Sequence, residues 1–241
     1  MILLPVAAAA EDYVTIAVAS NFGATARAIA AQFEQDEGYE IRITTASTGK
    51  LYAQVTNGAP FDLLLAADAE RPRRLEAAGL GVAGTRFTYA RGMLVLWSRT
   101  AHDCHAALRD EAGGRVAIAN PETAPYGAAA RSYLQQAGLW EATRDRLVIG
   151  ENIAQTLQFA ASGNAGLAFI ARSQLQAPSL PPASCSWPVP DSMHDPIDQQ
   201  AVLLRRGAAS AGAKAFLAFL RGDAGRAIIL RDGYGLPGVE D

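Results

Sequence analysis

Residues 41–68 constrain the fold more than any other part of this 241-residue sequence. The stretch begins with alternating apolar and polar residues, as a half-buried strand does, and a turn of small polar residues follows at 46–50. Leu51 and Val55 then have the i, i+4 spacing of a short helix. The apolar run at 61–65 is typical of a buried parallel strand. The stretch therefore predicts a strand–turn–helix–strand unit.

Two hydroxyl side chains, Ser47 and Thr48, stand where this strand turns into the helix. The N–H groups of a first helical turn have no partner inside the helix, and they carry the positive end of its dipole. Together with the hydroxyls they form a cradle of donors that suits an anion. Helix capping is the alternative interpretation of these residues. The two interpretations use the same N–H groups, so they are compatible.

A turn of the same kind precedes this unit. Residues 13–19 predict a strand, Ser20 and Asn21 follow it, and the apolar residues of 22–33 recur on one face of a helix. Two successive strand–turn–helix units imply a parallel sheet, whose ligand crevice lies at the C-terminal ends of the strands. Because both turns carry short polar side chains, the pattern favours anion binding over capping alone.

The α/β pattern restarts near residue 93 and predicts a second unit. Its long turn at 120–127 contains Tyr126, and Asn152 is a candidate N-cap for a helix that ends near Gly163. The prediction is an α/β fold with two lobes and a cleft between them. Lobe 1 is predicted at 12–90 and 202–241, lobe 2 at 91–201, and a signal-peptide remnant or tail at 1–11.

Composition and the first residues bear on the class of protein. Half of the residues are apolar and the net charge is −3, so there is no basic excess for nucleic acid or an anionic membrane. An anionic ligand must therefore be attracted locally.

The apolar, alanine-rich residues 1–10 are typical of the end of a secretory signal peptide, which predicts export. A disordered alanine-rich tail is the alternative.

The sequence gives little support to metal binding or catalysis. Cys104 and Cys185 lie in no CxxC pair, which disfavours structural zinc; they either pair in an oxidising compartment or stay as thiols. Gly49-Lys50 lacks the spacing of a nucleotide-binding P-loop. A GxSxG nucleophile elbow is absent. An α/β enzyme that acts on a phosphorylated substrate remains the alternative from another class.

Five segments carry a resemblance to a known family. They are AVASNF, ASTGKLYAQVTNGAPFDLLLAAD, NPETAPYG, GENI and the terminal DGYG. From residue 13 to residue 236 the chain resembles periplasmic molybdate-binding proteins of ABC importers. The resemblance implies a type II periplasmic binding fold, in which two lobes of mostly parallel sheet and flanking helices are joined by two crossings. The ligand, one tetrahedral oxyanion, is held in the interlobe cleft by neutral hydroxyls and backbone N–H groups.

The resemblance also implies the site residues. Many members have a tyrosine at the position of Ala171, whereas one branch instead has an asparagine in the first turn and a tyrosine in the Asn-Pro turn, and this chain fits that branch. Ile153 is expected to contribute its backbone N–H group. The predicted oxyanion ligands are Ser20, Asn21, Thr48, Tyr126 and Ile153, with Ser47 beside Thr48 as a further candidate.

The implied function is capture of molybdate or tungstate and delivery to the permease and ATPase of an ABC transporter. The protein is expected to act as a periplasmic monomer without a cofactor and without catalysis. A receptor for sulfate, thiosulfate or another small oxyanion is the alternative within the class. Molybdate and tungstate are nearly equal in size, so the sequence does not rank them.

Overall fold

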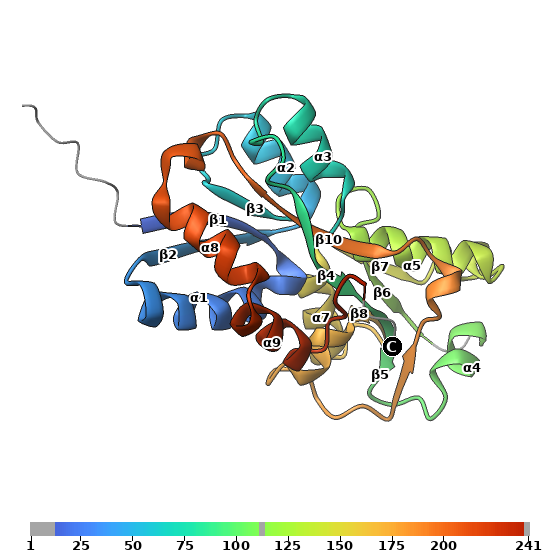
Figure 1. Cartoon of the computed structure of the whole chain (residues 1–241). Coiled ribbons are helices and arrows are strands. Elements are labelled where there is room, and N and C mark those ends of the chain that lie inside the picture. The colour runs from blue at the N-terminus through green and yellow to red at the C-terminus, as the bar shows by residue number, and fades with distance from the viewer. Residues whose placement is uncertain (1–12, 111–113, 239–241) are drawn as a thin grey trace, which may run out of the picture.

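The structure, a computed structural model, describes residues 13–110 and 114–238 and contains two five-stranded sheets with flanking helices (Figure 1). The predicted signal-peptide remnant at 1–11 lies outside the described residues. Within the described ranges, no helix is long and apolar enough to cross a membrane. The predicted α/β fold with mostly parallel sheets is confirmed.

The first sheet has the strand order β2-β1-β3-β10-β4. Strand β1 pairs in parallel with β2 and β3, whereas β10 is antiparallel to both β3 and β4. Helices α1, α8 and α9 pack on one face, and α2 and α3 pack on the other (Figure 1). The elements are β1 (Tyr13–Ala19), α1 (Gly23–Glu37), β2 (Glu40–Ala46), α2 (Thr48–Thr56), β3 (Leu63–Leu65), α3 (Glu70–Ala77), β4 (Phe87–Gly92), β10 (Ile197–Leu203), α8 (Ala211–Arg221) and α9 (Asp223–Arg231).

The second sheet has the order β7-β6-β8-β5-β9. Strand β6 is parallel to β7 and β8, and β5 is antiparallel to β8 and β9. Helices α4 and α5 pack on one face and α7 on the other. The elements are β5 (Leu94–Ser98), α4 (Cys104–Arg109), β6 (Val116–Ala119), α5 (Pro125–Gln136), α6 (Trp140–Arg144), β7 (Leu147–Gly150), α7 (Ile153–Ser162), β8 (Leu167–Ala171) and β9 (Cys185–Pro188).

Two connections link the sheets, and they lie side by side. Strand β4 leads into β5 through Met93, and residues 189–196 lead from β9 to β10. Gly92 at the end of β4 is opposite Ile197 at the start of β10. Residues 91–92 and 197–201, which the sequence pattern placed in lobe 2, are therefore strand residues of the first sheet. The polar residues at the start of β10 conceal this strand from a search for apolar runs.

Several short elements differ from the prediction. Helix α5 begins at Pro125, so the turn predicted at 120–127 ends earlier, and Tyr126 lies in a first helical turn. Proline is favoured at this position because the N–H group it lacks would have no helical partner. Strand β4 and helices α4 and α6 were not predicted, since each is short. The proline-rich region 177–190 contains β9, and prolines favour such extended backbone over a helix.

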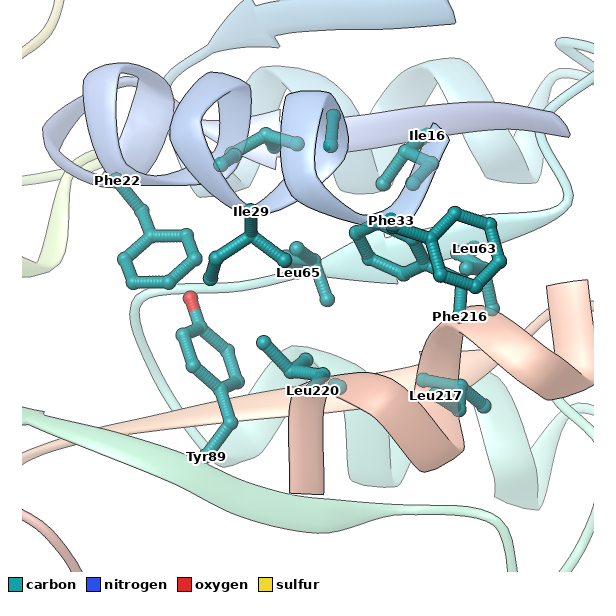
Figure 2. Close-up of a cluster of buried hydrophobic side chains, with 14 of the residues drawn as sticks. Ile16, Phe22, Ile29, Phe33, Leu63, Leu65, Tyr89, Phe216, Leu217 and Leu220 are labelled. Carbon is teal, nitrogen blue, oxygen red and sulfur yellow. The ribbon is translucent and has the colours of Figure 1, made fainter. Parts of the chain in front are cut away.

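A buried cluster holds the end of β1 in place (Figure 2). Phe33 of α1 packs edge-to-face on Phe216 of α8 at a centroid distance of 5.2 Å, and Phe22 packs on Tyr89 of β4 at 4.7 Å. Full burial of such a side chain contributes about 1.5–3 kcal/mol. Because Phe22 follows Asn21 directly, its burial fixes the polar turn at the end of β1.

The two cysteines are joined by a disulfide within the second unit. Cys104 at the start of α4 bonds to Cys185 at the start of β9, with their Cα atoms 5.7 Å apart. Cys185 is opposite Ser98, and Ser98 is opposite Leu167, the first residue of β8. The bond therefore stands at the end of the sheet opposite to the C-terminal end of β8.

Candidate ligand-binding site

One small cavity between the two units collects all of the residues that the sequence nominates. It has about 10 Å³ of room for the centre of a water-sized sphere, which is too little for an organic molecule. Backbone and apolar atoms of alanines and a proline complete the wall. The lining residues are Ala19, Ser20, Asn21, Ser47, Thr48, Ala67, Ala124, Pro125, Tyr126 and Ile153.

Ser47 and Thr48 offer hydroxyls from the turn between β2 and α2. Ser47 is the N-cap residue of α2, yet its side chain makes no capping hydrogen bond. Its Oγ atom is buried and has no partner among the residues that the structure describes. The Oγ1 atom of Thr48 accepts a hydrogen bond from the Ala67 N–H group at 3.0 Å, so its own proton is available to an acceptor in the cavity. Capping alone does not explain either hydroxyl.

Ser20 and Asn21 form the short 3₁₀ turn that follows β1. The side-chain Nδ2 of Asn21 donates to Oε1 of Gln199 at 2.9 Å and to Oη of Tyr234 at 3.3 Å. Both amide hydrogens are thus used away from the cavity. The group that Asn21 retains for a ligand is its backbone N–H, which lies in a first helical turn. Its side chain therefore serves to hold the turn.

The second unit contributes a backbone donor at the start of α7. Asn152 caps this helix as predicted, because its Oδ1 accepts from the N–H groups of Ala154 at 3.0 Å and Gln155 at 3.1 Å. The cap leaves the N–H of Ile153, the first residue of the helix, for the cavity. Gln174 donates from Nε2 to the Ile153 carbonyl at 3.0 Å, which holds this turn in place.

Tyr126 brings a phenol hydroxyl to the cavity from the first turn of α5. The residue is only 1% exposed, and its Oη accepts a hydrogen bond from Nε2 of Gln199 at 3.5 Å. Burial raises the pKa of Tyr126 well above 10, and Tyr234 raises it further. The phenol therefore stays protonated near neutral pH and acts as a donor. A Cβ atom on Gly92 would lie 2.3 Å from this Oη, so only glycine leaves room for it.

Sequence reasoning missed a buried polar network behind the cavity. Gln199 is fully buried, and its Oε1 accepts from Oη of Tyr89 at 3.2 Å as well as from Asn21. Ser173 donates from Oγ to Oη of Tyr234 at 2.9 Å. The sequence did contain a sign of this network, because a glutamine pair interrupts the apolar residues of β10 and buried polar groups require partners.

Ala171, the position of the absent tyrosine, is also buried and donates its N–H to Oε1 of Gln174 at 3.0 Å.

The two units are in contact beside the cavity. The Gly49 N–H donates to the Thr123 carbonyl at 2.8 Å. Lys50 forms an ion pair with Glu151 at 2.9 Å, and both side chains are largely exposed. An exposed pair of this kind contributes about 0–1 kcal/mol. The backbone hydrogen bond is therefore the more specific mark of closure.

The donors around the cavity are all electrically neutral, and the lining contains no charged side chain. The part of the chain described here also contains no group of three or more His, Cys, Asp or Glu residues that could hold a metal ion. Hydroxyl and N–H groups facing one small space suit a ligand that offers only lone pairs. Such an arrangement suits an anion.

Two α/β units joined by paired strands, with a cavity of neutral donors between them, define a solute-binding protein. The chain belongs to the family described as bacterial extracellular solute-binding protein, whose sequence pattern matches residues 14–235. This family assignment places the chain among binding proteins rather than enzymes.

Individual relatives narrow the comparison. The chain is 46% identical over 237 residues to the molybdate-binding protein ModA of Azotobacter vinelandii, which covers 97% of this chain and 94% of that protein. It is 42% identical over 229 residues to the molybdate-binding protein ModA of Rhodobacter capsulatus, and the match covers 94% of this chain and 89% of that protein. The solved structure of the Azotobacter vinelandii periplasmic molybdate-binding protein matches with a TM-score of 0.86 and 36% identity, over 93% of this chain and 99% of that chain.

Proposed function

We propose that this protein captures molybdate or tungstate between its two lobes and delivers the ion to the permease and ATPase of an ABC importer. One observation carries the proposal: the cavity is small and is lined by neutral donors from both units. The names of the relatives with 46% and 42% identity support molybdate as the ligand. The proposed ligands are the hydroxyls of Ser20, Ser47, Thr48 and Tyr126 and the backbone N–H groups of Asn21 and Ile153.

Neutral donors are sufficient to hold a dianion. Each hydrogen bond to a charged group contributes about 1.5–3 kcal/mol, and several together offset the loss of the ion's hydration. Since no cationic side chain is required, the ion is released once the lobes open. The backbone N–H groups and the Thr48 hydroxyl can only donate to the cavity, which disfavours phosphate because its protonated oxygen needs an acceptor. Sulfate, with its shorter bonds, is expected to reach fewer of the donors at once.

The proposal includes a location. The protein works as a monomer in the periplasm. Residues 1–11 are interpreted as the remnant of the signal for its export. The extracellular description of the family supports this location. The Cys104–Cys185 disulfide supports it independently, because disulfides persist in oxidising compartments.

Thermal unfolding with four anions tests the proposal. Molybdate or tungstate at about 100 times its Kd adds roughly 2.7 kcal/mol to the free energy of unfolding, which raises the Tm. Sulfate and phosphate at the same concentration are expected to leave the Tm nearly unchanged. An equal rise with sulfate would reassign the protein to the sulfate class, and turnover of phosphate esters would reassign it to the enzymes.

A further inference from the structure

A buried glutamine connects the two sides of the cavity from behind. Gln199 lies in β10 beside a register shift in its pairing with β4, and it is fully buried. Its Oε1 accepts from Nδ2 of Asn21 at 2.9 Å, and its Nε2 donates to Oη of Tyr126 at 3.5 Å. Asn21 belongs to the first unit and Tyr126 to the second. Gln199 therefore contacts candidate ligand-binding residues of both units.

The hydrogen bonds of this network run in one direction. Tyr234 donates its single proton to the backbone carbonyl of Asn21 at 2.8 Å, and a carbonyl can only accept. The Tyr234 oxygen must then accept, and it does so from Nδ2 of Asn21 at 3.3 Å. The second hydrogen of Nδ2 meets Oε1 of Gln199, so Gln199 turns its Nε2 toward Tyr126. A backbone carbonyl thus fixes the orientation of both amides.

The orientation of Gln199 decides what Tyr126 offers the cavity. A phenol hydroxyl can donate one hydrogen bond and can also accept. Because the Tyr126 oxygen already accepts from Gln199, its proton is the group directed to a ligand. An anion with lone pairs only can use this donor. An anion that carries its own proton finds no acceptor at Tyr126, and a buried donor left without a partner weakens binding.

We propose that Gln199 is the positioning residue that fixes Tyr126 as a donor, and that it thereby makes the site reject oxyanions that carry a proton. This inference rests on the oxyanion capture proposed above. It assigns the discrimination to a side chain that stands behind the cavity wall. Replacing the amide of Gln199 by a carboxylate of the same shape should reverse the hydrogen bond, since a carboxylate only accepts. Tyr126 would then present a lone pair to the ligand.

Selenate and hydrogen arsenate are suitable probes. At a mildly alkaline pH both are dianions of similar size, and they differ by one proton. The measured quantity is the ratio of the Kd of arsenate to that of selenate, obtained by calorimetric competition with molybdate. The wild-type ratio is expected to be ~10 or more, and Gln199→Glu should lower it by about tenfold. The added charge weakens both dianions alike and cancels in the ratio.

Two further variants make the test specific. Gln200→Glu adds the same charge at the next residue, whose side chain bonds to Arg86 at 2.7 Å and Thr88 at 3.0 Å instead of to Tyr126. Its ratio should equal that of the wild type. Gln199→Met removes the donor without adding a charge, so the Tyr126 hydroxyl can rotate and the ratio should fall by a smaller factor. This variant serves if the carboxylate hinders folding.

The outcomes separate the inference from the proposed function. A lowered ratio in the Gln199 variants, with the Gln200 variant unchanged, supports the inference. A wild-type ratio in both Gln199 variants overturns it and leaves oxyanion capture intact. A wild-type protein that binds none of molybdate, selenate and arsenate overturns both.

Discussion

Ser47 occupies the N-cap position of α2, but its side chain does not cap the helix. Asn152 occupies the equivalent position on α7, and its side chain accepts two backbone N–H groups. The Ser47 hydroxyl accepts none and is buried without a partner in the described chain, at the wall of the cavity. Sequence alone places both residues at the start of a helix, where capping is a possible interpretation of each. The difference lies in side-chain direction, which only the packed structure defines.

The Tyr126 hydroxyl is expected to be a ligand donor whose loss leaves the fold intact. Tyr126→Phe removes one hydrogen bond to a charged group, which contributes about 1.5–3 kcal/mol. The affinity for molybdate should fall by about one to two powers of ten, with little change in the Tm of the ligand-free protein. Titration calorimetry measures the first effect and thermal unfolding the second. Wild-type affinity would mean that the ring only packs.

Gly92 is expected to matter because of the space it leaves for Tyr126. In Gly92→Ala the new Cβ would lie 2.3 Å from Oη of Tyr126 and displace the ring. Affinity should fall at least as far as in Tyr126→Phe, and combining the two changes should cost little more, since they affect one contact. Gly235→Ala is the matched control, because its Cβ would meet its nearest neighbour, Arg91, at an ordinary 3.5 Å. Additive losses in the double variant would contradict this account.

At the scale of elements, prediction succeeded where a local pattern is complete. The β1 and β2 units carry an apolar strand, a polar turn and a helix face within a short stretch, so their bounds and their shared edge followed from the sequence. Strand β4 and helices α4 and α6 are too short to show a period. The role of Gln199 depends on Asn21, 178 residues away, and on Tyr126, 73 residues away. Such partners are brought together only by the topology of the sheets.

The turn that begins α2 is expected to limit closure of the cleft. In Gly49→Ala the new Cβ would lie 3.0 Å from the Thr123 backbone across the cleft, while alanine itself suits a helix. Molybdate affinity should fall by roughly tenfold or more because full closure is prevented, with stability kept. Calorimetry of Lys50→Ala is the control, since it removes only an exposed ion pair. Unchanged affinity in Gly49→Ala would show that binding does not need this contact.

At the scale of the whole molecule, the candidate site and the disulfide are separated in space. The cavity lies between the units, at the C-terminal ends of parallel strands of both sheets. The disulfide lies at the other end of the second sheet. The chain passes from the first sheet to the second through Met93 and returns to the first sheet through residues 189–196. We propose that the lobes divide at these two connections and move about them.

Loss of the disulfide is expected to affect stability and leave binding unchanged. Cys104 and Cys185 are separated by 81 positions, and closing a long loop of this kind typically contributes about 2–4 kcal/mol. Replacing both cysteines by serine should lower the free energy of unfolding by that amount, as measured in urea. Molybdate affinity should stay at the wild-type value. Two free thiols in the oxidised wild-type protein would contradict the pairing.

Titration calorimetry of the ligand-free protein with molybdate, and separately with sulfate, tests oxyanion capture most directly. The account predicts one molybdate bound per chain, with sulfate weaker by at least about a hundredfold, because the donors of the closed site are proposed to lie at the spacing of the larger ion. The Ser47→Ala variant should bind molybdate more weakly under the same conditions. Sulfate binding as tight as molybdate, or no heat with molybdate at all, would contradict the account.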